Sequence, residues 1–329
     1  MSYITESDIE AATLGWFDGL GYTTLYGPDI APGEPDAERQ SFADVVLVDR
    51  LYSALGQINP EIPVIALEEA RRKVLNAGLE SPSLYENNRR FHSLMTDGID
   101  VEYQVEGRSL YDKVWLIDFD DLDNNDWLVT NQFTVVEDRH NRRPDVIVFI
   151  NGLLLAVIEL KNPAEENATI RGAFNQLQTY RHDIPSLFPY NEILVISDGL
   201  TARAGTLTAD WERFMPWRTV EGDEIATNNT PELEVLLKGI FAKNRFLDLL
   251  RHFILFEVDD SIIKKMAGYH QFHAVNKAIA CTVKASSPTG DRRVGVVWHR
   301  QRQEFNNGVL CWKDYSALGN GKPYPRCTN

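Results

Sequence analysis

Three charged side chains near the middle of the chain have a spacing that could support hydrolytic chemistry. Asp145 precedes one apolar run, and Glu159 and Lys161 close the next run. Glu159 and Lys161 alternate along the chain, so they point to the same side of a strand. Two carboxylates suit a hard cation such as Mg²⁺, which activates water and stabilises charge on a phosphate. The pattern predicts a phosphodiester-cutting centre. The simpler interpretation is solvated charges at the ends of a buried strand.

The two apolar runs predict a β-hairpin. They cover residues 146–150 and 153–160, and the intervening Asn151 and Gly152 are a strong signal for a tight turn. The second run is almost continuously apolar, which is typical of a strand buried on both faces of a sheet.

The strand register decides whether the two carboxylates can meet. With a strict two-residue turn, Asp145 would lie opposite Ile158, and Glu159 would face away from it. A shared metal therefore requires an odd-length connection or a β-bulge. We predict the odd connection, with residues 151–153 as the loop, which sets Asp145 opposite Glu159.

The segment 141–163 closely resembles the nuclease core of the restriction (R) subunit of type I restriction-modification enzymes, which carry a PD-(D/E)xK nuclease fold at the N-terminus. The resemblance runs from about residue 5 to residue 299 and includes the segments 176–180, 195–205, 269–278 and 295–299. It implies that Asp145 and Glu159 are catalytic, metal-binding acids for Mg²⁺. It also implies that Lys161 is the catalytic lysine.

Gln176 and Tyr180 match an accessory element of that family, which lies near the site and the DNA backbone. A helix over residues 167–182, capped by Asn167, would make them i,i+4 neighbours. The alternative is an ordinary polar border of that helix.

Related nucleases usually add a carboxylate from a first helix. Thr5 and Asp8 predict a capping box for a helix over residues 5–20. Glu10 stands close to where resolvases of this superfold carry a helix glutamate, so we take Glu10 as the accessory acid. Glu6 is an alternative, and a plain surface glutamate is another interpretation of Glu10.

The remaining patterns predict an α/β fold with a PD-(D/E)xK nuclease-like mixed sheet flanked by helices, followed by the beginning of a RecA-like helicase domain. Predicted helices cover 39–54, 61–78, 231–254 and 262–280, and predicted strands cover 98–105, 113–118, 127–136, 192–197 and 294–298. Three aromatic residues, Trp211, Phe214 and Trp217, could form a base-stacking platform, although core packing beside the sheet is the favoured interpretation.

We expect an endonuclease domain over residues 1–245, and a connector helix with an incomplete motor start over 246–299. In the family, a glutamine at the position of Gln271 recognises the adenine of ATP. The expected phosphate loop is missing after residue 299, so we expect no ATP-driven translocation by this chain alone. We interpret 300–329 as a divergent tail, which out-of-frame translation could produce.

The net charge of −15 argues against a generic nucleic-acid binder. The charge is uneven, however, because basic residues cluster around the proposed site while aspartates gather in another segment. The basic residues are Arg139, His140, Arg142, Arg143, Lys161, Arg171, Arg181 and His182, and the acidic ones are Asp118, Asp120, Asp121, Asp123 and Asp126. This pattern fits a subunit that receives double-stranded DNA from partners, although both groups could be solvated loops.

The composition also bounds the cellular setting. No run of eighteen apolar residues and no signal-peptide pattern occurs, so we expect a cytoplasmic protein without membrane contact. Three cysteines at positions 281, 311 and 327 form no ligand pattern, so we expect no zinc site.

These observations leave three hypotheses. The first is a Mg²⁺-dependent endonuclease domain of a type I R subunit, whose partners are the methyltransferase and specificity subunits. The second is a catalytically silent module that docks on those subunits. The third is a structure-specific, resolvase-like nuclease that acts without partners.

Overall fold

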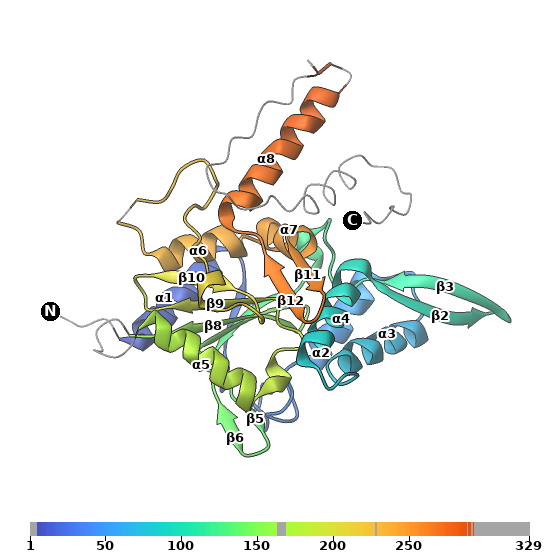
Figure 1. The fold of residues 1–329 in the computed structure, drawn as a ribbon. Coiled ribbons are helices and arrows are strands. Elements are labelled where there is room, and N and C mark those ends of the chain that lie inside the picture. The colour runs from blue at the N-terminus through green and yellow to red at the C-terminus, as the bar shows by residue number, and fades with distance from the viewer. Residues whose placement is uncertain (1–4, 163–168, 228, 288, 291, 293–329) are drawn as a thin grey trace.

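A six-stranded mixed β-sheet forms the centre of the computed structural model, which describes residues 5–162, 169–227, 229–287, 289–290 and 292 (Figure 1). Only the β1–β4 and β8–β9 pairs are parallel within this sheet. The predicted mixed α/β class is therefore confirmed. In spatial order the strands are β1 (Thr23–Tyr26), β4 (Trp127–Asn131), β7 (Val146–Ile150), β8 (Leu153–Leu160), β9 (Ile193–Ser197) and β10 (Ala202–Gly205).

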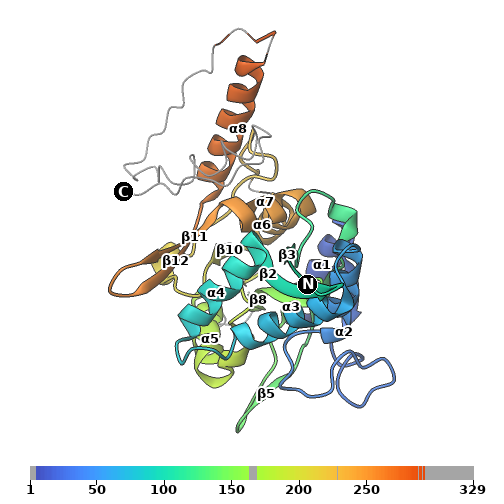
Figure 2. The same cartoon turned by 90° about the vertical axis from the view of Figure 1, so that its right-hand side faces the viewer.

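Helices flank this sheet, except for α8, which projects away from it, and three two-stranded hairpins lie outside the sheet (Figures 1 and 2). The helices are α1 (Glu6–Gly19), α2 (Val48–Ile58), α3 (Val64–Ala77), α4 (Leu84–Asp97), α5 (Ile170–Asp183), α6 (Glu232–Phe241), α7 (Lys243–His252) and α8 (Tyr269–Ser286). The hairpins are β2 (Ile99–Val105) with β3 (Arg108–Val114), β5 (Val135–Glu137) with β6 (His140–Arg142), and β11 (Ile254–Val258) with β12 (Ile262–Met266). Helix α5 lies along β8 and β9, whereas α1 packs against β1, β4 and α6. None of the helices in the described ranges is long and apolar enough to cross a bilayer.

The β7–β8 hairpin has the predicted register, but a β-bulge produces it and not a three-residue loop. The turn has two residues, because Ile150 pairs with Leu153, so the predicted three-residue loop is wrong. A β-bulge at Leu155 then shifts the register by one, and Val146 pairs with Ile158. The next position in this register sets Asp145 opposite Glu159. Both strands are fully buried, as the apolar run predicted.

The turn of this hairpin is held tightly by its surroundings. Asn151 and Gly152 both have positive φ angles, 54° and 74°, as a type I′ turn requires. The buried Asn151 amide donates to the Leu116 carbonyl over 2.8 Å, and its oxygen accepts from the Asp126 N–H over 2.7 Å. A Cβ on Gly152 would lie 2.3 Å from the Leu47 carbonyl oxygen, so only glycine fits. The turn therefore cannot lengthen without loss of these contacts.

Several predicted elements differ in the structure. The predicted helix 39–54 begins only at Val48, since turns and loops occupy 27–47. The predicted helix 231–254 is two helices, α6 and α7, because Ala242 between them is extended. The first part of the predicted helix 262–280 is strand β12, which pairs with β11, and the helix starts at Tyr269. Helix α4 was not predicted.

Other elements agree more closely, and some fall on residues that are not described. Thr169 caps α5 through a bond from the Gly172 N–H, and the expected cap Asn167 lies outside the described residues. The predicted strand 294–298 and the tail 300–329 also lie outside them. The capping box of Thr5 and Asp8 is confirmed.

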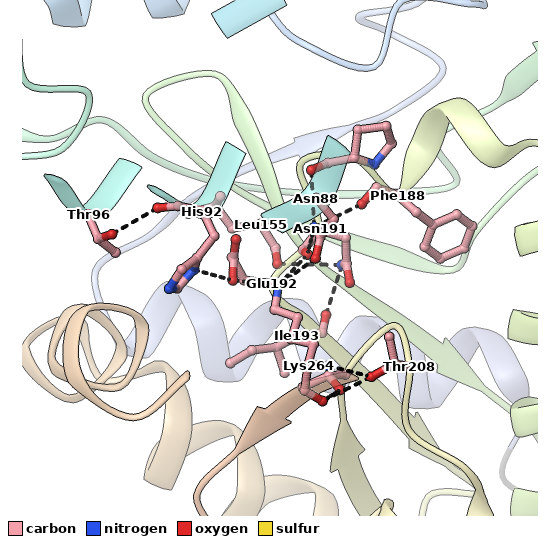
Figure 3. Close-up of polar contacts among 12 residues, drawn as sticks. Asn88, His92, Thr96, Leu155, Phe188, Asn191, Glu192, Ile193, Thr208 and Lys264 are labelled. Carbon is pink, nitrogen blue, oxygen red and sulfur yellow. Dashed lines mark hydrogen bonds and ion pairs between the residues drawn. The ribbon is translucent and has the colours of Figure 1, made fainter. Parts of the chain in front are cut away.

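A buried ionic cluster joins the β11–β12 hairpin to the central sheet (Figure 3). The Lys264 Nζ of β12 lies 2.6 Å from Glu192 Oε2, and both side chains are fully buried. The same ammonium donates to Asn88 Oδ1 and to the Asn191 carbonyl, while His92 Nδ1 lies 3.0 Å from Glu192 Oε2. Burial alone would raise the pKa of Glu192, but Lys264 and His92 hold it below its ordinary value.

This cluster lies directly behind the bulge of β8. The Glu192 N–H donates to the carbonyl of the bulged Leu155 over 2.7 Å. Residues 191 to 193 then lead into β9, which pairs in parallel with β8 through Glu159 and Ile196 as far as Leu160 and Ser197. The buried cluster therefore supports the strand that positions the candidate site.

Removal of the Lys264 ammonium tests this cluster. Lys264→Met leaves a buried carboxylate without its main partner, so we expect a loss of about 3–5 kcal/mol in the free energy of unfolding, measured by urea denaturation. The double variant Lys264→Met/Glu192→Gln leaves no buried charge unpaired and should recover at least half of that loss.

The neighbouring Lys265 is a matched control, because its ammonium pairs with the exposed Glu257. Lys265→Met should cost less than about 1 kcal/mol. A double variant at positions 264 and 192 that is less stable than Lys264→Met would contradict the pairing.

Candidate active site

A cleft of about 1070 Å³ opens where the charged ends of the hairpin meet the first turns of two helices. Helix α1 contributes one wall, α5 contributes another, and the segments beside β4 and β7 close the remainder. Its polar and charged lining includes Glu6, Glu10, Asn131, Gln132, Arg142, Arg143, Asp145, Asn175, Gln176 and Tyr180. The cleft therefore gathers groups that are far apart in the sequence.

Asp145 and Glu159 lie together at this point, as the register requires. The Leu160 N–H donates to Asp145 Oδ2 over 2.7 Å, which holds the carboxylate at the end of β8. Burial raises the pKa of Asp145 to about 6, although this backbone bond and Lys161 act in the opposite direction. Burial and the Asp145 carboxylate raise the pKa of Glu159 well above its ordinary value. The pair is therefore costly to ionise without a cation.

Lys161 lies beside these acids and is mostly shielded from solvent. Its Nζ lies 2.8 Å from Glu159 Oε1 and 3.9 Å from Glu6 Oε1. Its backbone N–H donates to the Ser197 carbonyl of β9, which fixes the end of β8. Burial is the largest single influence and would lower the pKa of Lys161, but the neighbouring carboxylates of Glu159, Asp145 and Glu6 together raise it above its ordinary value. The side chain therefore carries a positive charge at neutral pH.

Helix α1 adds two carboxylates to the cleft. Glu6, Glu10 and Asp145 each offer an oxygen within 4.8 Å of the others. Glu10 is only 8% exposed, so the interpretation of a plain surface glutamate is wrong. Its oxygens accept from Gln132 Nε2 over 2.6 Å and Asn131 Nδ2 over 3.2 Å. The structure therefore brings both alternatives from the first helix into the same site.

Gln176 and Tyr180 lie on the cleft side of α5. Gln176 Nε2 donates to the Tyr180 hydroxyl over 2.6 Å, and that hydroxyl donates to the Arg143 carbonyl over 3.4 Å. Burial, together with the nearby Glu159 charge, raises the pKa of Tyr180, so the phenol keeps its proton. The predicted helix neighbours are confirmed as a bonded pair at the candidate site.

One group at the site, Gln132, escaped the sequence patterns. Gln132 adopts a left-handed φ of 55°, its N–H donates to the Asp145 carbonyl, and its side chain binds Glu10. Neither its residue type nor its spacing signals this role.

Gln271 lies at the start of α8, where its side chain accepts from the Gly268 N–H over 2.9 Å. Its predicted contact with adenine stays a prediction.

The donor set of this cleft fits a divalent cation. Glu159 Oε2 is buried and has no hydrogen-bond partner within the part of the chain that the structure describes. An orphaned carboxylate oxygen is costly in such a place, and a cation would satisfy it. Asp145, which interacts with Glu159, also belongs with Glu6 and Glu10 to a trio of carboxylates whose oxygens lie within 4.8 Å of one another; Glu159 is not part of that trio. Such oxygen ligands are of the kind that Mg²⁺ prefers. We therefore treat the cleft as a candidate metal-dependent active site.

The fold and this acidic cleft define a candidate hydrolase, and comparison with known proteins gives the family. The model described as the N terminus of the type I restriction enzyme R protein matches residues 3–213. The chain belongs to this family, as its sequence motifs predicted.

Two curated relatives support this family assignment. The chain is 39% identical over 303 residues to the endonuclease subunit of the type I restriction enzyme HindI of Haemophilus influenzae. It is 34% identical over 315 residues to an endonuclease subunit named MjaIXP of Methanocaldococcus jannaschii. The matches cover 91% and 89% of this chain, but only 28% and 29% of the two relatives. The chain thus spans less than a third of the length of these curated relatives.

The raised pKa of Asp145 has a consequence for stability. In the unfolded chain this carboxyl titrates near 3.8, whereas in the folded protein it titrates near 6. Stability from this group is present below the unfolded value and is lost as the pH rises through 6. Without metal, Asp145→Asn should therefore be more stable than wild type at pH 7.5, by on the order of 2 kcal/mol, and the difference should shrink at pH 4.5. Urea denaturation in a chelator measures it.

Asp183 is a control of opposite sign. His182 and Arg142 hold the pKa of Asp183 below its ordinary value, so Asp183→Asn should be less stable than wild type at pH 7.5. A stability difference for Asp145→Asn that is independent of pH would rule out the proposed ionisation behaviour.

Proposed function

We propose that this chain is the Mg²⁺-dependent DNA endonuclease domain of a type I restriction enzyme R subunit, and that its fold is of the PD-(D/E)xK nuclease type. One observation carries the proposal. Asp145, Glu6 and Glu10 each offer a carboxylate oxygen within 4.8 Å of the others. The buried Glu159 has one oxygen without a hydrogen-bond partner among the described residues, and the Lys161 ammonium lies 2.8 Å from its other oxygen. Such a concentration of acids is unfavourable unless it serves a cation.

The proposed roles follow from the positions of the side chains. Asp145 and Glu159 hold the metal, and Glu10 stands beside them as the accessory acid, oriented by Gln132. When bound, a divalent cation lowers the pKa of a water molecule and stabilises negative charge on the scissile phosphate. Lys161 orients the attacking water or neutralises charge on the phosphate, since its ammonium lies 2.8 Å from Glu159 Oε1 and 3.9 Å from Oε1 of Glu6, which lines the cleft.

Gln176 and Tyr180 position the DNA backbone in this proposal. Their mutual hydrogen bond orders both side chains on the wall of the cleft, and the buried phenol remains a donor. The Arg143 side chain lines the same cleft and offers a guanidinium for a phosphate. Binding of the backbone by such groups would align one phosphodiester with the acids.

The larger assembly is also a proposal, supported by the family. The specificity subunit would supply sequence recognition, and the methyltransferase subunit would complete the complex on double-stranded DNA. A RecA-like motor would begin within residues 246–299, where Gln271 would contact ATP. The relatives are named endonuclease subunits of type I restriction enzymes, which is consistent with this arrangement.

Nicking of supercoiled plasmid tests the proposed function. The full chain, with purified methyltransferase and specificity subunits added, should nick plasmid in Mg²⁺ but not in EDTA. Asp145→Asn and Lys161→Met should each lower the nicking rate at least about 100-fold, because one removes a metal ligand and the other removes the cation that faces the phosphate. Glu102→Gln, on the exposed β2–β3 hairpin, is the matched control and should leave the rate unchanged.

The competing hypotheses give other outcomes. A silent docking module would bind the partner subunits but show no Mg²⁺-dependent nicking, and Asp145→Asn would leave its behaviour unchanged. A resolvase-like nuclease would cut branched DNA without partners. The net charge of −15 favours the docking alternative for the isolated chain. The nicking assay is therefore run both with and without the partner subunits.

A further inference from the structure

Two arginines converge on one partly exposed tryptophan beside the candidate site. The guanidinium carbon of Arg171, in the first turn of α5, lies 4.7 Å from the centre of the Trp211 ring. The guanidinium carbon of Arg203, on β10, lies 4.7 Å from the same ring. Phe214 and Trp217 are buried, so core packing is confirmed for these two residues, but Trp211 keeps part of its surface in solvent. Trp211 packs against the edge of the core, where its ring contacts Phe174, and leaves its remaining surface to the two arginines and solvent.

The two guanidiniums lack a carboxylate partner among the residues that the structure describes. In the described ranges of the chain, neither Arg171 nor Arg203 forms an ion pair, and Arg203 donates only to the Phe214 carbonyl over 3.4 Å. Two like charges held against one ring repel each other. The chain carries 48 acidic and 33 basic residues. Because acids are in excess, most arginines are expected to have an acidic partner. An anion from outside the chain would satisfy both groups.

The strand register connects this pair to the candidate site. Glu159 pairs with Ile196, and Ile196 pairs with Arg203, so the three side chains leave the same face of the sheet. Two strand spacings separate Glu159 from Arg203, which is about 10 Å. Arg171 directly precedes Gly172, which lines the cleft. Arg171 thus lies in the first turn of α5 beside a residue of the cleft, and Arg203 lies on the same face of the sheet as Glu159.

We propose that Arg171, Trp211 and Arg203 form a contact for the phosphate backbone of duplex DNA that lies across the cleft. A guanidinium binds phosphate through a planar fork of donors, and stacking on the indole restrains it before the ligand arrives. A DNA duplex repeats its charges along both strands, so one phosphate can lie at the acids while others meet this pair. The contact rests on the proposed function, since it takes DNA as the ligand.

The affinity for DNA and its salt dependence test this contact. The full chain with Asp145→Asn, in EDTA, is titrated with a labelled 30-base-pair duplex at several salt concentrations. Arg171→Gln/Arg203→Gln should weaken binding at least about 10-fold and lower the slope of log K against log salt by about 2, because each lost phosphate contact removes about 0.9. Arg171→Lys/Arg203→Lys keeps both charges and should retain most of the slope.

The matched control removes two arginines elsewhere. Arg89→Gln/Arg90→Gln lies on α4, where both guanidiniums are already paired with acids, and should change neither affinity nor slope. An unchanged slope for the 171/203 double variant, an equal loss in the α4 control, or no duplex binding by the parent chain would each overturn the contact. If Trp211→Leu weakens only binding to single-stranded DNA, the tryptophan is a base-stacking platform and the backbone contact is wrong.

The binding assay separates this inference from the proposed function. It contains no metal and uses a variant that lacks Asp145, so its result does not depend on catalysis. Mg²⁺-dependent nicking by wild type, combined with undiminished duplex binding by the 171/203 variant, would refute the contact and leave the nuclease intact. Loss of binding in that variant, combined with no nicking by wild type, would support the contact and remove the proposed activity.

Discussion

The one-residue offset in the β7–β8 hairpin is the constraint on which the site depends. Side chains alternate along a strand, so a regular hairpin with the observed turn would direct Asp145 and Glu159 to opposite faces. The bulge at Leu155 corrects this offset inside a fully buried pair of strands. The turn cannot make the correction itself, because Asn151 and Gly152 are locked against the Leu47 and Asp126 backbones.

The surroundings of the bulge explain why this irregularity persists. A bulge leaves one residue outside the regular ladder, and the Leu155 carbonyl finds its partner in the Glu192 N–H. Glu192 is in turn held by Lys264 and His92. Buried ion pairs often contribute little net stability, and this one links β12 to the residues that lead into β9. The ionic cluster and the register that sets Asp145 opposite Glu159 are therefore parts of one structural unit, although 119 positions separate Asp145 from Lys264.

Features that depend on local sequence patterns could be predicted well. Strand alternation and the Asn-Gly turn located the hairpin, parity required the shift that joins Asp145 to Glu159, and the capping box located α1 with Glu10. The site of the shift was not predictable, because Leu155 stands in a uniform apolar run. Lys264 gave no signal either. A lysine in 262–266 suits an exposed helix, and only pairing with β11 makes this segment a strand and buries the side chain. Gln132 depends on a left-handed backbone that glutamine rarely adopts.

The central claim is that these carboxylates converge in order to hold a divalent cation. The most direct test is anomalous diffraction from crystals of the full chain soaked in Mn²⁺, which takes oxygen ligands as Mg²⁺ does. The account predicts an anomalous peak in contact with the carboxylates of Asp145 and Glu159, on the side of Glu10. A fully occupied Mn²⁺ site elsewhere on the protein, with no peak between these two residues, would contradict it.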